Sequence, residues 1–163
     1  MGKWKKFVWV LSIFLMVILL GTMIRQCVIY YILPPDYAFA QRLYEYDQEH
    51  YQVIIDYFAA SGDQKIHIDK ASYQNRDMQV AGKQIEDPQV LKALKHLFLF
   101  KGYRSVGRNG DTIYFEKWSF WERSRGLVYL LNEASDVYVE FIVSTKPLSD
   151  SPWYYYETDV GQF

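Results

Sequence analysis

The longest apolar stretch of the chain lies near its start. Residues 7–24 carry no charged side chain, and Lys3, Lys5 and Lys6 precede them. At about 1.5 Å per residue, a helix of this length measures roughly 27 Å, close to the ~30 Å hydrocarbon core of a bilayer. A helix also satisfies its own backbone hydrogen bonds, which lipid cannot do. The pattern therefore predicts a membrane-spanning helix.

Apolar residues continue beyond Arg25 as far as Leu33, where two prolines follow. Pro34 and Pro35 end the helical pattern, because proline lacks the backbone donor and restricts the residue before it. The predicted organisation is a basic cytoplasmic tip over 1–6, a transmembrane and interfacial helix over 7–33, and a separate domain over 36–163.

The basic residues around the span set its expected orientation. Lysines before the span favour a cytoplasmic N-terminus, and Arg25 on the far side weakens this preference without reversing it. A cleaved signal peptide would need small residues after the apolar run, and Gly21–Cys27 offers no such pair. We therefore expect a single-pass signal-anchor in the cell membrane, with the lipid bilayer as a partner and the C-terminal domain extracytoplasmic.

Helical periodicity returns directly after the two prolines. Asp36 is a candidate N-cap, and apolar residues then recur at helical spacing until Ser61 and Gly62 end the pattern. Acidic and amide residues, Asp47 among them, are expected on the solvent side. The predicted buried face comprises Phe39, Leu43, Tyr46, His50, Val53, Ile54, Tyr57 and Phe58.

Alternating and helical patterns predict an α+β domain after this first helix. Asp87 followed by Pro88 begins a second helix, which ends near Gly102. Asn109 followed by Gly110 is a strong hairpin signal, which places Arg108 opposite Asp111. The fold class is therefore two helices packed on a mainly antiparallel sheet. Strands are predicted at 65–69, near 78–80, and at 103–108, 111–118, 126–132, 137–143 and 153–157.

Charge and cysteine content narrow the function classes. Four of the 18 basic residues precede residue 36 and all 19 acidic residues follow residue 35, so the domain carries a net charge of −5. An acidic domain lacks the electrostatic footprint for nucleic acid. Cys27 is the only cysteine, so no intrachain disulfide can form. A disulfide-free domain outside the cytoplasm is common in bacteria.

Known catalytic and metal-binding motifs are missing from the sequence. His50, His67 and His96 fall on three different predicted elements, without the spacing of a zinc site. No nucleophile elbow and no P-loop occurs, and the apolar setting of Cys27 disfavours a thiolate. The sequence predicts no catalytic residue, no metal and no cofactor.

One segment, residues 116–123, concentrates aromatic and acidic side chains. Aromatic faces can stack on sugars, and paired carboxylates can act as acid and base on glycans. In the alternative interpretation, the rings pack under neighbouring strands while the carboxylates face water. The candidate ligand-binding residues are Glu116, Trp118, Phe120, Trp121 and Glu122.

The C-terminal residues Lys146-Pro147-Leu148, followed by Trp153-Tyr154-Tyr155-Tyr156-Glu157, form a pattern of their own. This pattern resembles one in uncharacterised small single-pass membrane proteins of Gram-positive bacteria. The resemblance covers the last third of the chain, and it implies a bacterial membrane protein without implying an activity.

The favoured hypothesis is a membrane-anchored extracytoplasmic binding or interaction module, whose partner would be a membrane or envelope protein. One alternative is an envelope enzyme acting on glycans, with Glu116 and Glu122 as its acids. Another alternative is a small structural subunit of a membrane complex, although the span lacks a G-x-x-x-G face for helix pairing.

Overall fold

A computed structural model describes residues 3–28, 34–121, 123–148 and 152–162. The chain divides into two compact units, Met1–Leu33 and Pro34–Phe163. Candidate residue Glu122 and the end of the predicted span, residues 29–33, lie outside the described residues.

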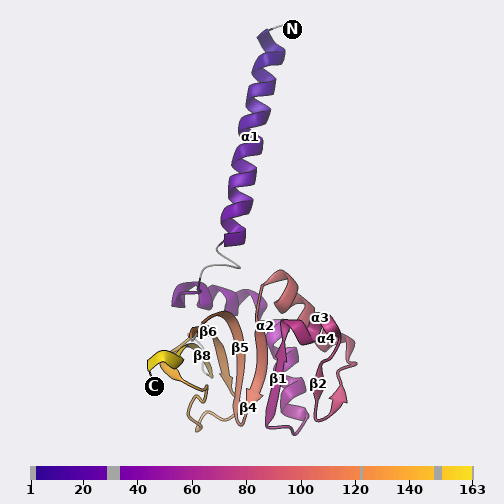
Figure 1. The fold of residues 1–163 in the computed structure, drawn as a ribbon, viewed down its shortest axis with the longest axis vertical. Helices are drawn as coiled ribbons and strands as arrows, with labels where there is room; N and C mark the ends of the chain where they lie inside the picture. Colours follow the sequence, from indigo (N-terminus) through magenta and orange to yellow (C-terminus); the bar gives the residue numbers. More distant parts are fainter. Residues whose placement is uncertain (1–2, 29–33, 122, 149–151, 163) are drawn as a thin grey trace. The chain divides into compact units, whose positions relative to one another are not determined.

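The first unit is a single long helix, α1, over Lys3–Cys27 (Figure 1). Its segment Val8–Arg25 is long and apolar enough to cross a membrane, and none of that segment is buried within the structure. The predicted apolar helix is therefore confirmed. Length and composition of this kind suit either a transmembrane anchor or a signal sequence.

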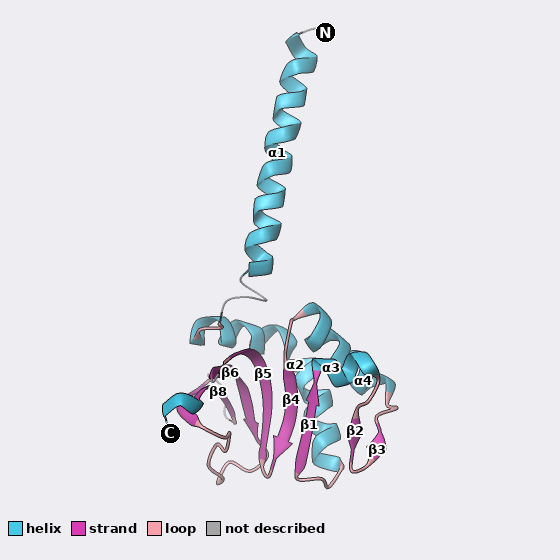
Figure 2. Cartoon of the chain, viewed as in Figure 1, coloured by secondary structure: helices cyan, strands magenta, loops and turns pink. Residues whose placement is uncertain are grey.

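The second unit is an α+β domain, as the sequence predicts (Figure 2). A six-stranded antiparallel sheet has the strand order β1-β4-β5-β6-β8-β7, and β2 and β3 form a separate pair. The helices are α2 (Tyr37–Ala60), α3 (Lys70–Asn75), α4 (Pro88–Lys95), the π-helical turn η2 (His96–Phe100) and the 3-10 turn η3 (Val160–Gln162). The strands are β1 (Lys65–Asp69), β2 (Gln79–Val80), β3 (Lys83–Gln84), β4 (Ser105–Asn109), β5 (Thr112–Phe120), β6 (Arg123–Leu130), β7 (Ile142–Pro147) and β8 (Trp153–Asp159).

Local sequence signals explain where the two main helices of the domain begin. The Asp36 carboxylate accepts a hydrogen bond from the Phe39 amide at 2.7 Å, which caps α2. Asp87 caps α4 in the same way, and Pro88 occupies the first turn, where its missing N–H costs nothing. Both predicted starts are confirmed.

The predicted buried face of α2 is confirmed at Leu43, Ile54 and Phe58 but is wrong at Tyr46 and Asp47. Tyr46 is 80% exposed, whereas Asp47 is only 3% exposed. Asp47 tolerates burial because His96 and Lys101, from elements distant in sequence, bind its carboxylate. The buried residues are Ala40, Leu43, Tyr44, Asp47, Tyr51, Ile54, Ile55 and Phe58.

The hairpin register also differs from the prediction. Asn109 pairs with Thr112, so Gly110 and Asp111 form the two-residue loop instead of Asn109 and Gly110. The Gly110 amide donates to the Gln64 carbonyl at 2.9 Å, which extends the ladder between β1 and β4 by one step. Asn109 is thereby held in the strand.

Two further segments differ from the sequence expectation. Residues 137–141 form a loop instead of a strand, and β7 begins only at Ile142. Residues 70–75, expected to be irregular, form α3, because the Asp69 carboxylate caps the helix by accepting from the Ser72 amide at 2.6 Å.

Helix α2 seals one face of the sheet. The buried Tyr51 ring packs against Phe115 of β5 and Trp153 of β8, with ring centroids 4.9 Å and 5.3 Å apart. The Tyr51 hydroxyl also forms a 2.6 Å hydrogen bond with that of Tyr103, so this polar atom is satisfied inside the core.

The opposite face of the sheet is covered only in part by the loop over residues 131–141. Beneath this loop, Val128, Leu130 and Tyr156 form a small buried cluster, onto which Val137 and Val139 pack. We call this whole face of the sheet, opposite α2, the open face.

Candidate functional site

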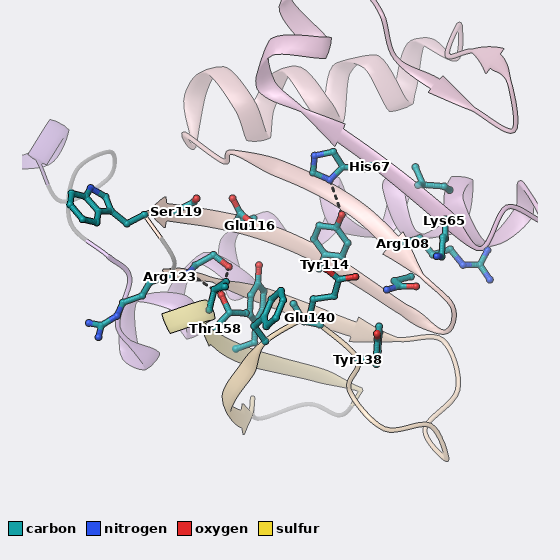
Figure 3. Close-up of a pocket in the computed structure, with 18 residues that line it drawn as sticks. Lys65, His67, Arg108, Tyr114, Glu116, Ser119, Arg123, Tyr138, Glu140 and Thr158 are labelled. Carbon is teal, nitrogen blue, oxygen red and sulfur yellow. Dashed lines mark hydrogen bonds between the residues drawn. The ribbon is translucent and has the colours of Figure 1, made fainter. Parts of the chain in front are cut away.

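A groove of about 460 Å³ lies on the open face, between the sheet and the loop over residues 138–141 (Figure 3). This volume falls within the range of small-molecule sites. Strands β1, β4, β5, β6 and β8 all contribute to the lining. The groove is therefore a floor of strands with a loop along one side.

A glycine in β4 allows a tyrosine to lie across the floor. His67, Gly107 and Tyr114 are cross-strand neighbours in β1, β4 and β5. A Cβ atom on Gly107 would collide with the ring and hydroxyl of Tyr114. Because Gly107 has no side chain, Tyr114 reaches His67, and its hydroxyl lies 2.8 Å from His67 Nδ1 (Figure 3).

The next row of the sheet repeats this arrangement. Glu116, Gly126 and Tyr156 are cross-strand neighbours in β5, β6 and β8. A Cβ on Gly126 would collide with the Phe115 carbonyl oxygen and crowd the Tyr156 ring. Because Gly126 has no side chain, no side chain covers the floor directly beside Glu116 at this position.

The ionisable groups of the floor are shifted by their surroundings. Burial raises the pKa of Tyr114 to about 12, and the Glu116 and Glu140 carboxylates add to this rise. Tyr114 therefore stays protonated at neutral pH and can donate to His67 Nδ1, which leaves Nε2–H of the neutral imidazole as a donor. Burial also raises the pKa of Glu116, although Arg104 and a hydrogen bond with Ser119 oppose it.

Hydroxyl groups continue the polar floor toward the end of β8. The Ser124 and Thr158 hydroxyls are 2.8 Å apart, and the Ser124 amide donates to Thr158 Oγ1 at 3.0 Å. Ser119 lines the same end of the groove. The floor thus offers hydroxyl, imidazole and carboxylate groups along its length.

Exposed aromatic side chains surround this polar floor. Trp121, Tyr138 and Phe141 line the groove and are 90%, 57% and 45% exposed. Trp121 and Phe141 have φ values of 56° and 58°, a region that bulky residues rarely adopt. Such strain is typical of positions where function requires the side chain.

The structure separates the five candidate residues of the sequence. Glu116 and Trp121 line the groove, whereas Trp118 and Phe120 are absent from the lining residues that the structure describes. Glu122 lies outside the described part of the chain.

A β-bulge explains why Glu116 and Trp118 are separated. Glu116 pairs with Gly126, but Trp118 pairs with Arg125, so Lys117 is the extra residue. Ser119, rather than Trp118, then shares the face of Glu116. Simple alternation would have placed residues 116, 118 and 120 together.

Several groove residues were missed from sequence, among them His67, Tyr114, Tyr138, Glu140 and Phe141. Two signals pointed toward them. Glycine inside a strand marks a close approach of another group, and Gly107 and Gly126 both do so. Loop residues also carry function more often than strand residues, but 137–143 was expected to be a strand.

A second polar cluster lies on the helix-covered side, around Asp47. Its Oδ1 is 2.9 Å from His96 Nε2 and 3.1 Å from Lys101 Nζ. The His50 and His96 rings, expected on separate elements, have centroids 3.9 Å apart. Within the described residues, no three His, Cys, Asp or Glu side chains are placed to hold a metal ion.

No family model, curated protein sequence or solved structure matches this chain.

Proposed function

We propose that this chain is a single-pass protein of the cell membrane, whose extracytoplasmic domain binds a glycan of the cell envelope in the groove of the open face. The observation that carries the proposal is the set of exposed rings of Trp121, Tyr138 and Phe141 around a polar floor. Aromatic faces stack on the apolar faces of sugars, while the floor can hydrogen-bond to their hydroxyl groups.

The floor supplies both kinds of hydrogen-bonding group that a sugar hydroxyl needs. Glu116 accepts, as does Glu140 from the loop across the groove, His67 Nε2–H donates in the neutral imidazole, and the hydroxyls of Ser119 and Ser124 can do either.

The apolar helix supports the membrane location. Val8–Arg25 has the length and composition of a span, and Lys3, Lys5 and Lys6 precede it. The positive-inside rule then assigns the lysines to the cytoplasm and the groove to the outside. A tether of this kind raises the effective concentration of the domain near envelope components.

Glycan binding can be tested with the full-length protein in nanodiscs and an N-acetylglucosamine tetramer as the probe. Tyr138→Ala removes an exposed groove ring and should weaken binding about three- to tenfold. Tyr46→Ala, which removes an exposed tyrosine of α2 that does not line the groove, is the matched control. Equal affinities of the two variants, or no binding by the unmodified protein, would contradict the proposal.

Orientation can be tested by labelling in intact cells. In a Cys27→Ser background, a cysteine introduced at the exposed residue Glu133 should react with a membrane-impermeant maleimide before lysis. Labelling seen only after lysis would place the domain in the cytoplasm and overturn the proposed topology.

A further inference from the structure

We infer that the groove prefers glycans that carry an ammonium group, as amino sugars do, with Glu116 and Glu140 binding the cation among the aromatic rings. This inference rests on the proposed glycan-binding function and names its ligand class. It starts from two groove carboxylates that form no ion pair within 4 Å among the described residues.

Glu116 and Glu140 form no ion pair within 4 Å among the described residues, whereas Asp47, Asp159 and Glu157 each do. Glu116 is half-buried in the floor, and Glu140 comes from the loop across the groove. Both carboxylates act on the Tyr114 hydroxyl, so they share one part of the groove (Figure 3). Burying a carboxylate is costly, and Arg104 offsets only part of the effect of burial on Glu116, so a cationic ligand would offset more of that cost. Glu140 is exposed and would add attraction without a burial cost of its own.

The arginines and the lysine of the lining form no ion pair with Glu116 or Glu140 within 4 Å among the described residues. Arg108 donates to the Gly110 and Phe58 carbonyls, both at 2.8 Å, which directs its guanidinium to the end of α2. Arg123 binds Asp159 at 3.0 Å and points away from the floor in Figure 3. Lys65 lies at the far end of the floor from Ser119 (Figure 3). Arg104 acts on Glu116 from outside the lining, but it forms no ion pair with Glu116 within 4 Å among the described residues.

Aromatic rings add a second attraction for a cation. Tyr138 and Phe141 flank Glu140 in the loop, and Tyr114 lies beneath on the floor. The face of an aromatic ring attracts an ammonium group within about 6 Å, and the attraction grows when water is excluded. Rings and carboxylates in one groove thus suit an ammonium group better than a neutral acetamide.

The test compares two probes that differ only in this group. Full-length protein in nanodiscs is titrated with the N-acetylglucosamine tetramer and with the glucosamine tetramer, at a mildly acidic pH where the amines are protonated. We expect the amino tetramer to bind about tenfold tighter, and this preference to shrink with added salt. Glu140→Gln should lower the preference to about threefold, and Glu116→Gln combined with Glu140→Gln should abolish it.

Glu133→Gln is the matched control, because Glu133 is an exposed carboxylate of the same covering loop that does not line the groove. Equal binding of the two probes would overturn the ammonium preference while leaving the glycan proposal intact. A preference that survives in the double variant would also overturn it. Binding of neither probe would overturn both proposals.

Discussion

The two faces of the sheet show how one strand can serve stability and binding at once. On β5, Ile113 and Phe115 are fully buried against the helix-covered side, while Tyr114 and Glu116 lie on the open face. The helix-covered side is closed by aromatic packing, whereas the open face keeps half-buried polar groups. We therefore expect Ile113 and Phe115 to contribute mainly to the free energy of unfolding, and Tyr114 and Glu116 to contribute mainly to ligand binding.

The sharpest test of this contrast is a pair of neighbouring substitutions. Phe115→Ala should lower the free energy of unfolding by about 4 kcal/mol, because it leaves a cavity beneath Tyr51 and Trp153. Tyr114→Phe should cost less than about 1 kcal/mol, since only the hydrogen bond to His67 is lost. Urea unfolding of the full-length protein in micelles, followed by near-UV circular dichroism, measures both, and similar losses would refute the division of roles.

A second test measures how stability depends on pH through Lys117, whose ammonium group is buried on the helix-covered side. Burial lowers the pKa of the Lys117 ammonium, which donates to the Lys101 carbonyl, to about 8. Between pH 8 and 10 the unfolded chain keeps this proton while the folded chain releases it, so stability should rise with pH, by roughly 2–3 kcal/mol. Above pH 10 it should fall, because burial raises the pKa of Tyr51 and Tyr156 well above 10 in the folded state.

Urea unfolding across this pH range measures the Lys117 effect. Lys117→Met is the control, and it should flatten the rise between pH 8 and 10 while leaving the fall above pH 10. A rise that persists in Lys117→Met would assign the effect to another group.

A third test addresses the glycines of the open face. Gly126→Ala should destabilise the domain by about 1–2 kcal/mol, because the new Cβ meets the Phe115 carbonyl oxygen, which belongs to the backbone and cannot rotate away. The same urea experiment measures the loss. An unchanged midpoint would mean that β6 shifts freely and that the row of Glu116, Gly126 and Tyr156 is not tightly held.

Local signals in the sequence were sufficient for the fold class and for several boundaries. The caps Asp36 and Asp87 act through hydrogen bonds within three residues, so their effect is visible in the sequence. The strand at Lys65–Asp69 matches its alternating pattern residue for residue. Helix and strand order then led to the α+β class, which the structure confirms.

The candidate site could not be predicted in the same way, because it is formed by contacts between residues distant in sequence. Burial of Asp47 requires His96, 49 positions away, and the Tyr114–His67 contact spans 47 positions. The bulge at Lys117 shifts the alternation of side chains between the two faces of the sheet by one residue. Trp118 and Phe120 therefore lie on the opposite face from Glu116, although alternation along β5 predicts the same face. No local pattern signals such a bulge, because it is decided by pairing with β6.

The smallest expected effect concerns Trp121, where stability and binding should change in opposite directions. Its φ of 56° lies in the left-handed region, which asparagine adopts at lower cost, so Trp121→Asn should raise the free energy of unfolding by about 1 kcal/mol. The same change removes an exposed groove ring and should weaken binding of the N-acetylglucosamine tetramer. Phe120→Asn, at the neighbouring exposed residue outside the groove lining, is the control and should leave binding unchanged. A Trp121→Asn variant that is more stable and binds equally well would show that the strain at the end of β5 has no role in binding.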